Sequence, residues 1–529
     1  MPIDTTHPYG RLLVTLSRRQ LLDIAWKLGA VAALPMTTRV SWAQPIFRNY
    51  PFSLGVASGD PWPDSVVLWT RLAPEPFDGG GMPMANVEVS WQVAPDSAFR
   101  TIAQSGTVLA RPELGHSVHV EAKGLAPGRE YFYRFRCGGE TSQVGRTKTA
   151  PAPSAAVDKL RFGVCGCGHF ESGYFSAYGR LADEHFDFVF HTGDYIYEGR
   201  GDAGRNPANV RTHLGGEIYT LVDYRNRYAQ YKSDPDLMAA HHSAPFIVSW
   251  DDHEVDNDYA GDRDERDTPP EVFLLRRAAA YQAYYESMPL RESLIPNGPH
   301  LPLYRRMQFG DLVDFNVLDT RQYRSKQAAC GDPVTCPELL DVRRTILGPD
   351  QERWLFQNLT TSTSRWNVLA QQVPTFARDM ASVNAASRFS VDKWDGYVES
   401  RQRLFTHLRD ATVRNPIVLS GDVHTGWCAD LKANFADPSS PTIGVEFTNT
   451  SVTSGGDGTD SQPSWESLRR DNPHITFHSN KRGYTACTAT ASAMQADFRV
   501  VDRVSVPKQP VRTARSMIVP AGRPGSATA

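Results

Sequence analysis

The sequence predicts a layered α/β domain preceded by a small antiparallel β-sandwich. Short segments before residue 148 alternate between apolar and polar residues with a period of two, as the strands of a sandwich do. After residue 158, apolar strands alternate with amphipathic helices, which is typical of a layered α/β fold. A run rich in proline and alanine separates the two patterns and predicts a linker over residues 149–157.

The composition is that of an ordinary globular protein. Of the 529 residues, 40% are hydrophobic and 22% are charged, which excludes a disordered chain, a collagen-like repeat and a coiled coil. No run approaches the ~20 apolar residues of a membrane-spanning helix. The 56 basic and 59 acidic side chains leave a net charge of −3, so we expect no specific nucleic-acid recognition.

Residues 1–43 have the features of an export signal. Arg18 and Arg19 precede a modest apolar stretch, and residues 41–43 have the small-x-small pattern of a cleavage site. The segment resembles a twin-arginine signal, and it predicts that the twin-arginine export machinery carries the protein to the periplasm or outside the cell. A short amphipathic helix with a chance pair of arginines is the alternative.

Residues 44–148 are predicted to form the β-sandwich. Segments 87–93 and 131–136 alternate with a period of two. Leu125 and Tyr131 have the spacing of a tyrosine corner, in which the module resembles fibronectin type III domains. We expect this module to carry no chemistry.

Residues 158–505 are predicted to form the α/β domain. Strands are expected at 160–164, 186–191, 246–250, 312–318, 366–370 and 417–420, and helices at 173–184 and 271–288. The final segment, 506–529, is rich in proline, arginine, serine and alanine, and we expect it to add little ordered structure.

The chain has seven cysteines, so at least one thiol has no partner within it. Cys330 and Cys336 enclose a short loop that contains glycine and proline. They are predicted to form a local disulfide bond, which an oxidising compartment outside the cytoplasm allows.

Four of the predicted strands are followed by loops rich in metal-ligating side chains. The loops cover residues 165–169, 193–198, 250–258 and 420–424. Sites in α/β folds form at the carboxyl ends of strands, so carboxylates, a thiol, a phenol and imidazoles should converge on one crevice. Because so many anionic groups share a pocket only when cations lie between them, the sequence predicts a multi-metal centre.

One set of these side chains suits a transition metal. Cys167, Tyr197 and His424 offer sulfur, phenolate and imidazole ligands, and a phenolate favours a strong Lewis acid such as Fe(III). The alternative for Cys167 is a buried or disulfide-bonded pair with Cys165.

A second set offers only oxygen ligands. Asp252 and Asp422 suit Ca²⁺, Mg²⁺ or Mn²⁺, with zinc as a further alternative. Asp194 could bridge the two sets. Taken alone, each loop could instead be a structural turn or a solvated acidic loop.

The pattern of the loops resembles the metallophosphoesterase superfamily, and within it the PhoD-like alkaline phosphatase/phosphodiesterase family. The matching stretches extend over nearly the full chain and include residues 55–61, 68–71, 193–197, 253–254, 318–324, 370–373, 421–424 and 452–456. The resemblance implies a metallophosphoesterase-type α/β sandwich and the hydrolysis of phosphate esters.

The resemblance also implies an iron site. Cys167 stands where many members of the superfamily have aspartate, and it is expected to bind iron as a thiolate. Tyr197 and His424 complete the iron shell in this interpretation, with Asp194 as the bridging ligand. The chain departs from the family at His169, which could add a ligand, face the substrate or lie at the surface.

The oxygen ligands differ from the usual superfamily pattern. Asp252 replaces an asparagine and Asp422 replaces a histidine. Both changes would turn a second transition-metal site into an oxygen-rich calcium site, in which Asp252 takes part in catalysis as a ligand.

The expected mechanism is attack of a metal-activated water on the phosphorus atom. His253 is the candidate for donating a proton to the leaving oxygen, oriented by Asp256 or Glu254; a packing or ligand role is the alternative. Arg321 and Arg324 could bind the phosphate, and ion pairing with nearby acids is their alternative.

Three function classes follow from these residues. The first is an alkaline phosphatase acting on small phosphate monoesters. The second is a phosphodiesterase, including a phospholipase D-like enzyme acting on a phospholipid or a polymeric phosphodiester. The third is a non-catalytic exported metal-binding or adhesion protein that uses the sandwich.

Overall fold

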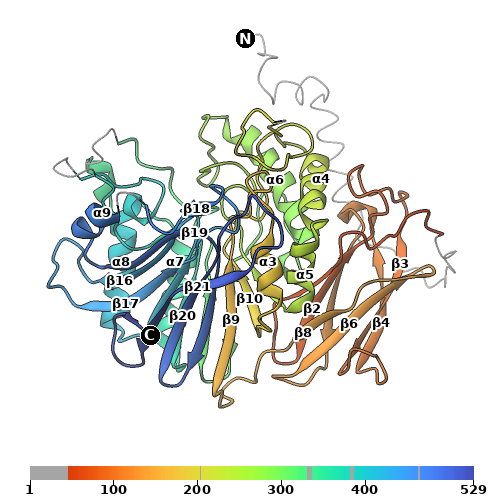
Figure 1. Ribbon diagram of the computed structural model, residues 1–529, viewed down its shortest axis with the longest axis horizontal. Helices are drawn as coiled ribbons and strands as arrows, with labels where there is room; N and C mark the ends of the chain where they lie inside the picture. Colours follow the sequence, from red (N-terminus) through yellow and green to blue (C-terminus); the bar gives the residue numbers. More distant parts are fainter. Residues whose placement is uncertain (1–45, 203, 331–335, 382–386, 463–464) are drawn as a thin grey trace, which may run out of the picture. The chain divides into compact units, whose positions relative to one another are not determined.

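The computed structural model describes residues 46–202, 204–330, 336–381, 387–462 and 465–529 (Figure 1). The predicted export signal, residues 1–43, lies outside this part of the chain. Within the described residues, no helix combines the length and the apolar character needed to cross a membrane.

Two layers of strands form the predicted sandwich. One layer has the order β4-β3-β6-β7, with β8 also paired to β6; its strands are β3 (Val87–Ala94), β4 (Gln104–Ala110), β6 (Glu130–Cys137), β7 (Glu140–Thr141) and β8 (Gly145–Lys148). The other layer contains β1 (Val56–Gly59), β2 (Ser65–Arg71) and β5 (Ser117–Lys123). Apolar side chains of both layers share one buried cluster. The predicted tyrosine corner is present, because the Ala126 backbone N–H donates to Tyr131 Oη at 2.9 Å.

The α/β region contains two groups of parallel strands. In the first sheet β10 pairs with both β9 and β11; the bounds are β9 (Lys159–Cys165), β10 (Phe188–His191) and β11 (Phe246–Val248). In the second sheet β13, β14, β15 and β17 are parallel, with β12 and β16 antiparallel at its sides. Their bounds are β12 (Arg305–Phe309), β13 (Val313–Val317), β14 (Trp366–Ala370), β15 (Pro416–Ser420), β16 (Gly426–Lys432) and β17 (Thr442–Thr448).

A long strand, β19 (Ile475–Thr490), joins the two sheets. Its first residues pair with β16 and its last residues pair with β9. Aromatic side chains pack between the sheets, as where the rings of Phe188 and Phe309 stack at 4.6 Å. The sandwich continues the first sheet, since Gly59 in β1 pairs with Phe246 in β11. The sandwich and the α/β region therefore belong to one compact unit.

Helices cover the outer faces of this layered core (Figure 1). Four of them pack with the first sheet: α3 (Ser176–Ala182), α4 (Leu221–Lys232), α5 (Pro235–Ser243) and α6 (Pro270–Ser287). Two pack with the second sheet: α7 (Pro349–Thr361) and α8 (Val398–Asp410). The short helix α9 (Trp465–Asp471) precedes β19. The start of α4 is fixed by a capping box between Thr220 and Asp223.

The expectation for the C-terminal segment was wrong. Residues 511–520 form β21 (Val511–Pro520), which pairs antiparallel with β20 (Ala493–Val501), and β22 (Ala527–Thr528) pairs with β21 in turn. Met517 and Val519 are buried, whereas Arg512 and Arg515 are exposed. The segment therefore has one buried and one exposed face, as antiparallel strands commonly do, and its polar composition concealed that alternation.

Cys330 and Cys336 form a disulfide bond in the structure. The other five cysteines are free and buried: Cys137, Cys165, Cys167, Cys428 and Cys487. The alternative of a disulfide bond between Cys165 and Cys167 is therefore not what the structure shows.

Candidate metal centre

The four predicted loops meet at the carboxyl ends of the strands, and they do so with unusual backbone conformations. Cys167, Asp194, Asp422 and His424 have φ angles of 55°, 54°, 66° and 57°. Non-glycine residues adopt this left-handed region uncommonly, and such strain is concentrated at functional sites. Close packing enforces the geometry, because a Cβ atom on Gly166 or on Gly421 would collide with the Thr192 side chain.

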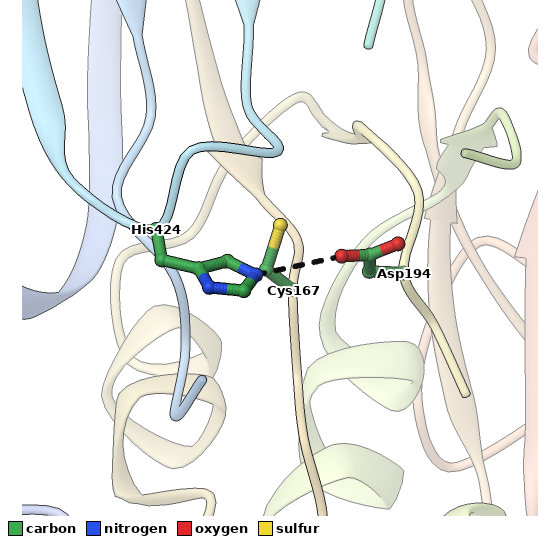
Figure 2. A group of neighbouring side chains, drawn as sticks. All are labelled: Cys167, Asp194 and His424. Atoms are coloured by element: carbon green, nitrogen blue, oxygen red, sulfur yellow. Dashed lines mark ion pairs between the residues drawn. The ribbon is translucent and has the colours of Figure 1, made fainter. Parts of the chain in front are cut away.

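Cys167, Asp194 and His424 point toward one another across three loops (Figure 2). One ligating atom from each lies within 4.8 Å of the others. His424 Nε2 is 3.7 Å from Asp194 Oδ2. The Tyr197 hydroxyl donates to Asp194 Oδ2 at 2.8 Å and lies 3.2 Å from His424 Nε2. The four residues predicted for the transition-metal site are thus brought together.

This group needs positive charge in order to ionise. Burial raises the pKa of the Cys167 thiol well above its usual value, and the nearby Asp194 and Asp251 raise it further. Burial and Asp194 likewise raise the pKa of Tyr197. Among the described residues, the buried Asp194 Oδ1 has no hydrogen-bond partner. A bound cation would supply that partner and would favour the thiolate and phenolate, so the donor set fits a metal ion.

Two oxygen-rich groups adjoin the first. Asp194, Asp252 and His253 form one, and Asp251, Asp252 and Asp422 form the other. Asp194 belongs to two of the three groups, as does Asp252, so the candidate sites are contiguous. Burial opposes the ionisation of Asp252, but Arg321 and His253 outweigh that effect and lower its pKa.

Arg321 and Arg324 form ion pairs with acids beneath the centre. Arg321 is fully buried, and its Nη2 lies 3.0 Å from Asp422 Oδ1. Arg324 Nη2 lies 2.6 Å from Asp392 Oδ1. The ion-pairing alternative therefore describes both side chains, which balance the charge of the carboxylates.

A cavity of about 290 Å³ opens at the centre, and two other cations line it. The ionisable residues of its lining are Arg378, Lys393, Asp194, Asp252, Asp258, Asp422, His253 and His424. Lys393 Nζ contacts Asp422 Oδ1 at 2.6 Å and Asp392 Oδ2 at 2.8 Å. The sequence did not single out Arg378 or Lys393, because both lie in an irregular stretch between β14 and α8 and belong to no recognisable motif.

His253 pairs with a residue other than the two expected. Its Nδ1 lies 2.7 Å from Glu198 Oε2. Asp256 instead lies 2.7 Å from Arg276, and the Glu254 carboxylate accepts hydrogen bonds from the backbone N–H groups of Asp194, Tyr195 and Asp251. The prediction that Asp256 or Glu254 orients His253 was therefore wrong.

The Glu198 carboxylate stabilises the imidazolium form of His253. Burial opposes protonation of this imidazole, but Glu198 and then Asp252 outweigh burial and raise its pKa well above the usual value. The ring also packs on Tyr197, with centroids 4.1 Å apart. His253 therefore lies at the wall of the cavity, with Nδ1 held by a carboxylate that favours the protonated imidazole.

Comparisons with known proteins agree with this architecture. The model of the PhoD-like phosphatase family matches residues 162–498, and the model of that family's N-terminal domain matches residues 38–151. Alkaline phosphatase D of Bacillus subtilis (strain 168) is 49% identical over 512 residues, which cover 95% of this chain and 88% of the relative. A solved structure of PhoD superposes with a TM-score of 0.89 at 49% identity, covering 92% of this chain and 93% of that one. The chain belongs to the PhoD-like phosphatase family.

Proposed function

We propose that the chain is an exported multi-metal hydrolase of phosphate esters, and most directly an alkaline phosphatase of the PhoD type. Family membership makes it a phosphoric ester hydrolase. The observation that carries the multi-metal part is the sharing of Asp194 and Asp252 between adjacent ligand groups. Shared carboxylates hold metal ions close enough to act on one phosphoryl group.

The ligand types assign the metals. Cys167, Tyr197 and His424 would hold Fe(III), with Asp194 bridging to the neighbouring site, because thiolate and phenolate favour a strong Lewis acid. The unpartnered Asp194 Oδ1 supports a bridging role.

Asp252 and Asp422 would hold Ca²⁺, with Mn²⁺, Mg²⁺ and Zn²⁺ as the alternatives. Asp251, Asp252 and Asp422 crowd around the Arg321 guanidinium, and one ligating oxygen of each lies within 4.8 Å of the others, which supports a further cation there. When bound, such ions supply positive charge for the phosphoryl oxygens and activate water for in-line attack.

Lys393 and Arg378 would bind the phosphate. Both line the cavity, and Lys393 Nζ forms an ion pair with Asp422. A metal ion at Asp422 would weaken that pair and leave the Lys393 ammonium available to a phosphoryl oxygen. Positioned positive charge of this kind provides most of the acceleration in phosphoryl transfer.

His253 would donate the proton to the leaving oxygen. Glu198 holds Nδ1, which leaves Nε2 for the substrate, and the same carboxylate raises the pKa of the imidazole and so favours its protonated form. Asp252 acts beside it as a ligand.

Substrate class is tested by comparing rates on p-nitrophenyl phosphate and bis(p-nitrophenyl) phosphate. Faster hydrolysis of the monoester supports the alkaline phosphatase. Faster hydrolysis of the diester favours the second candidate, a phosphodiesterase or phospholipase D-like enzyme acting on a phospholipid or polymeric phosphodiester. Hydrolysis of neither by the metal-replete protein would contradict both and favour a binding protein.

The metal assignment is tested by elemental analysis of protein exported by its own signal. One iron with calcium per chain supports it, whereas zinc alone contradicts it. Export by the twin-arginine route is tested by changing Arg18 and Arg19 to lysine. The variant is expected to stay in the cytoplasm, and export at the normal level would refute this route.

A further inference from the structure

A second cluster of ligating side chains lies beside the candidate centre. His169, Glu171 and His213 each offer one ligating atom, and these atoms lie within 4.8 Å of one another. Glu171 and His213 are buried, with 4% of each residue's surface exposed. The first two residues follow β9, and His213 lies on the loop before α4. No member of the cluster belongs to the ligand groups assigned above.

The carboxylate of Glu171 has one oxygen engaged and one directed to the cluster. Oε1 accepts hydrogen bonds from the Asp202 backbone N–H at 2.8 Å, the Thr212 hydroxyl at 3.0 Å and the His213 backbone N–H at 3.0 Å. Oε2 lies 3.7 Å from His213 Nδ1. The loop backbone thus fixes the carboxylate and leaves Oε2 as the ligating atom.

Each imidazole is anchored through one nitrogen. His213 Nε2 lies 2.9 Å from the Tyr231 hydroxyl, and His169 Nδ1 lies 2.6 Å from the Ser172 hydroxyl. The rings meet edge to face, with centroids 5.3 Å apart. Metal-binding histidines have this arrangement, in which an outer partner fixes one nitrogen and the other binds the ion.

The donor set matches a small divalent transition-metal ion. Ligands about 2.0–2.1 Å from a tetrahedral Zn²⁺ lie about 3.3 Å apart, close to the 3.7 Å between Glu171 Oε2 and His213 Nδ1.

We propose that His169, Glu171 and His213 bind one divalent transition-metal ion, with Zn²⁺ as the best match to two imidazoles and one carboxylate. The ion would support the wall of the main centre. The His169 ring packs edge-on against Tyr197, with centroids 4.7 Å apart, and the His169 backbone N–H donates to Ser454 Oγ, which contacts the Tyr197 hydroxyl at 2.6 Å.

The test measures zinc in the full-length protein after loading with iron, calcium and Zn²⁺ and exhaustive dialysis. Wild type is expected to retain one equivalent of zinc that the Cys167→Ala variant also retains, since that change affects only the main centre. His169→Gln and Glu171→Gln should lose this equivalent. His300→Gln, which changes an exposed histidine, should keep it.

A graded variant covers the case in which a ligand change prevents folding. Ser172→Ala removes only the outer partner of His169 and should weaken zinc affinity by about 10–100-fold, while thermal unfolding in excess zinc stays close to wild type. The proposal is overturned if all of the zinc that the wild-type protein retains is lost in the Cys167→Ala variant. Equal zinc content and affinity in His169→Gln, Ser172→Ala and wild type would overturn it as well.

Discussion

The pairing of His253 with Glu198 allows the change in the His253 pKa to be predicted when the charge of Glu198 is removed. Glu198→Gln keeps the shape of the side chain but removes the charge 2.7 Å from His253 Nδ1. A hydrogen bond to a charged group is worth about 1.5–3 kcal/mol, and one pKa unit corresponds to about 1.4 kcal/mol. We therefore expect the pKa of His253 to fall by about 1–2 units in the variant.

The sign of the effect determines where it is seen. In the proposed mechanism the protonated imidazole is the general acid, so activity that needs it should be present below its pKa and lost as pH rises through that value. With an alkyl phosphate, the alkaline limb of kcat/KM should shift to lower pH by about 1–2 units in Glu198→Gln. An NMR titration of the His253 imidazole would measure the same shift directly.

The leaving group provides the control. An alkoxide leaving group needs the proton, whereas p-nitrophenolate does not. His253→Ala should therefore slow the hydrolysis of an alkyl phosphate by about 10²–10⁴-fold and that of the p-nitrophenyl ester distinctly less. The metal content of the variant should stay near that of the wild type. An alkaline limb that is unchanged in Glu198→Gln would refute the assignment of Glu198. Equal losses on both esters, or loss of metal, in His253→Ala would make His253 a positioning or ligand residue.

Other predictions concern metals and stability. Cys167→Ala should abolish activity and most bound iron, and a variant that kept both would refute the thiolate assignment. Cys330→Ala should leave metal content unchanged while lowering the free energy of unfolding by about 2 kcal/mol, from the loss of a short-loop crosslink, as measured by urea denaturation. Calcium chelation should inactivate the enzyme reversibly, because a Ca²⁺ ion held by only a few carboxylates, such as those of Asp252 and Asp422, exchanges readily. Recovery of activity with Zn²⁺ but not with Ca²⁺ would contradict the assignment of calcium to this site. Tyr131→Phe should cost about 0.5–1.5 kcal/mol through the lost hydrogen bond to the Ala126 N–H, and an unchanged urea midpoint would show that this bond contributes nothing.

Much of the fold and of the candidate ligand set could be predicted because their signals are local. The strands before Cys167, Asp194 and Asp422 are short apolar runs, and each candidate ligand follows within a few residues of the strand end. Parallel strands then bring these residues to one edge without further information. The β-sandwich was equally accessible, since β3 and β6 alternate with a period of two.

The remaining features depend on contacts distant in sequence. Glu198 and His253 are 55 residues apart, and nothing in either loop distinguishes Glu198 from Glu254 as the partner. Lys393 reaches the centre from an irregular segment in which no periodicity exists to be read. The sequence did not predict strand β21, because the proline- and arginine-rich composition of this segment conceals its alternation of buried and exposed residues.

The backbone at Cys167 has a consequence for how such centres diversify. Left-handed φ values are several-fold commoner for aspartate, asparagine and histidine than for most other residues. At the φ angle of 55° found at position 167, cysteine is therefore less favoured than aspartate. An exchange between cysteine and aspartate at this position therefore needs no rearrangement of the loop. A single amino-acid substitution could convert a soft ligand into a hard one within an unchanged backbone, and related enzymes could in this way acquire different metals while keeping the same chain path.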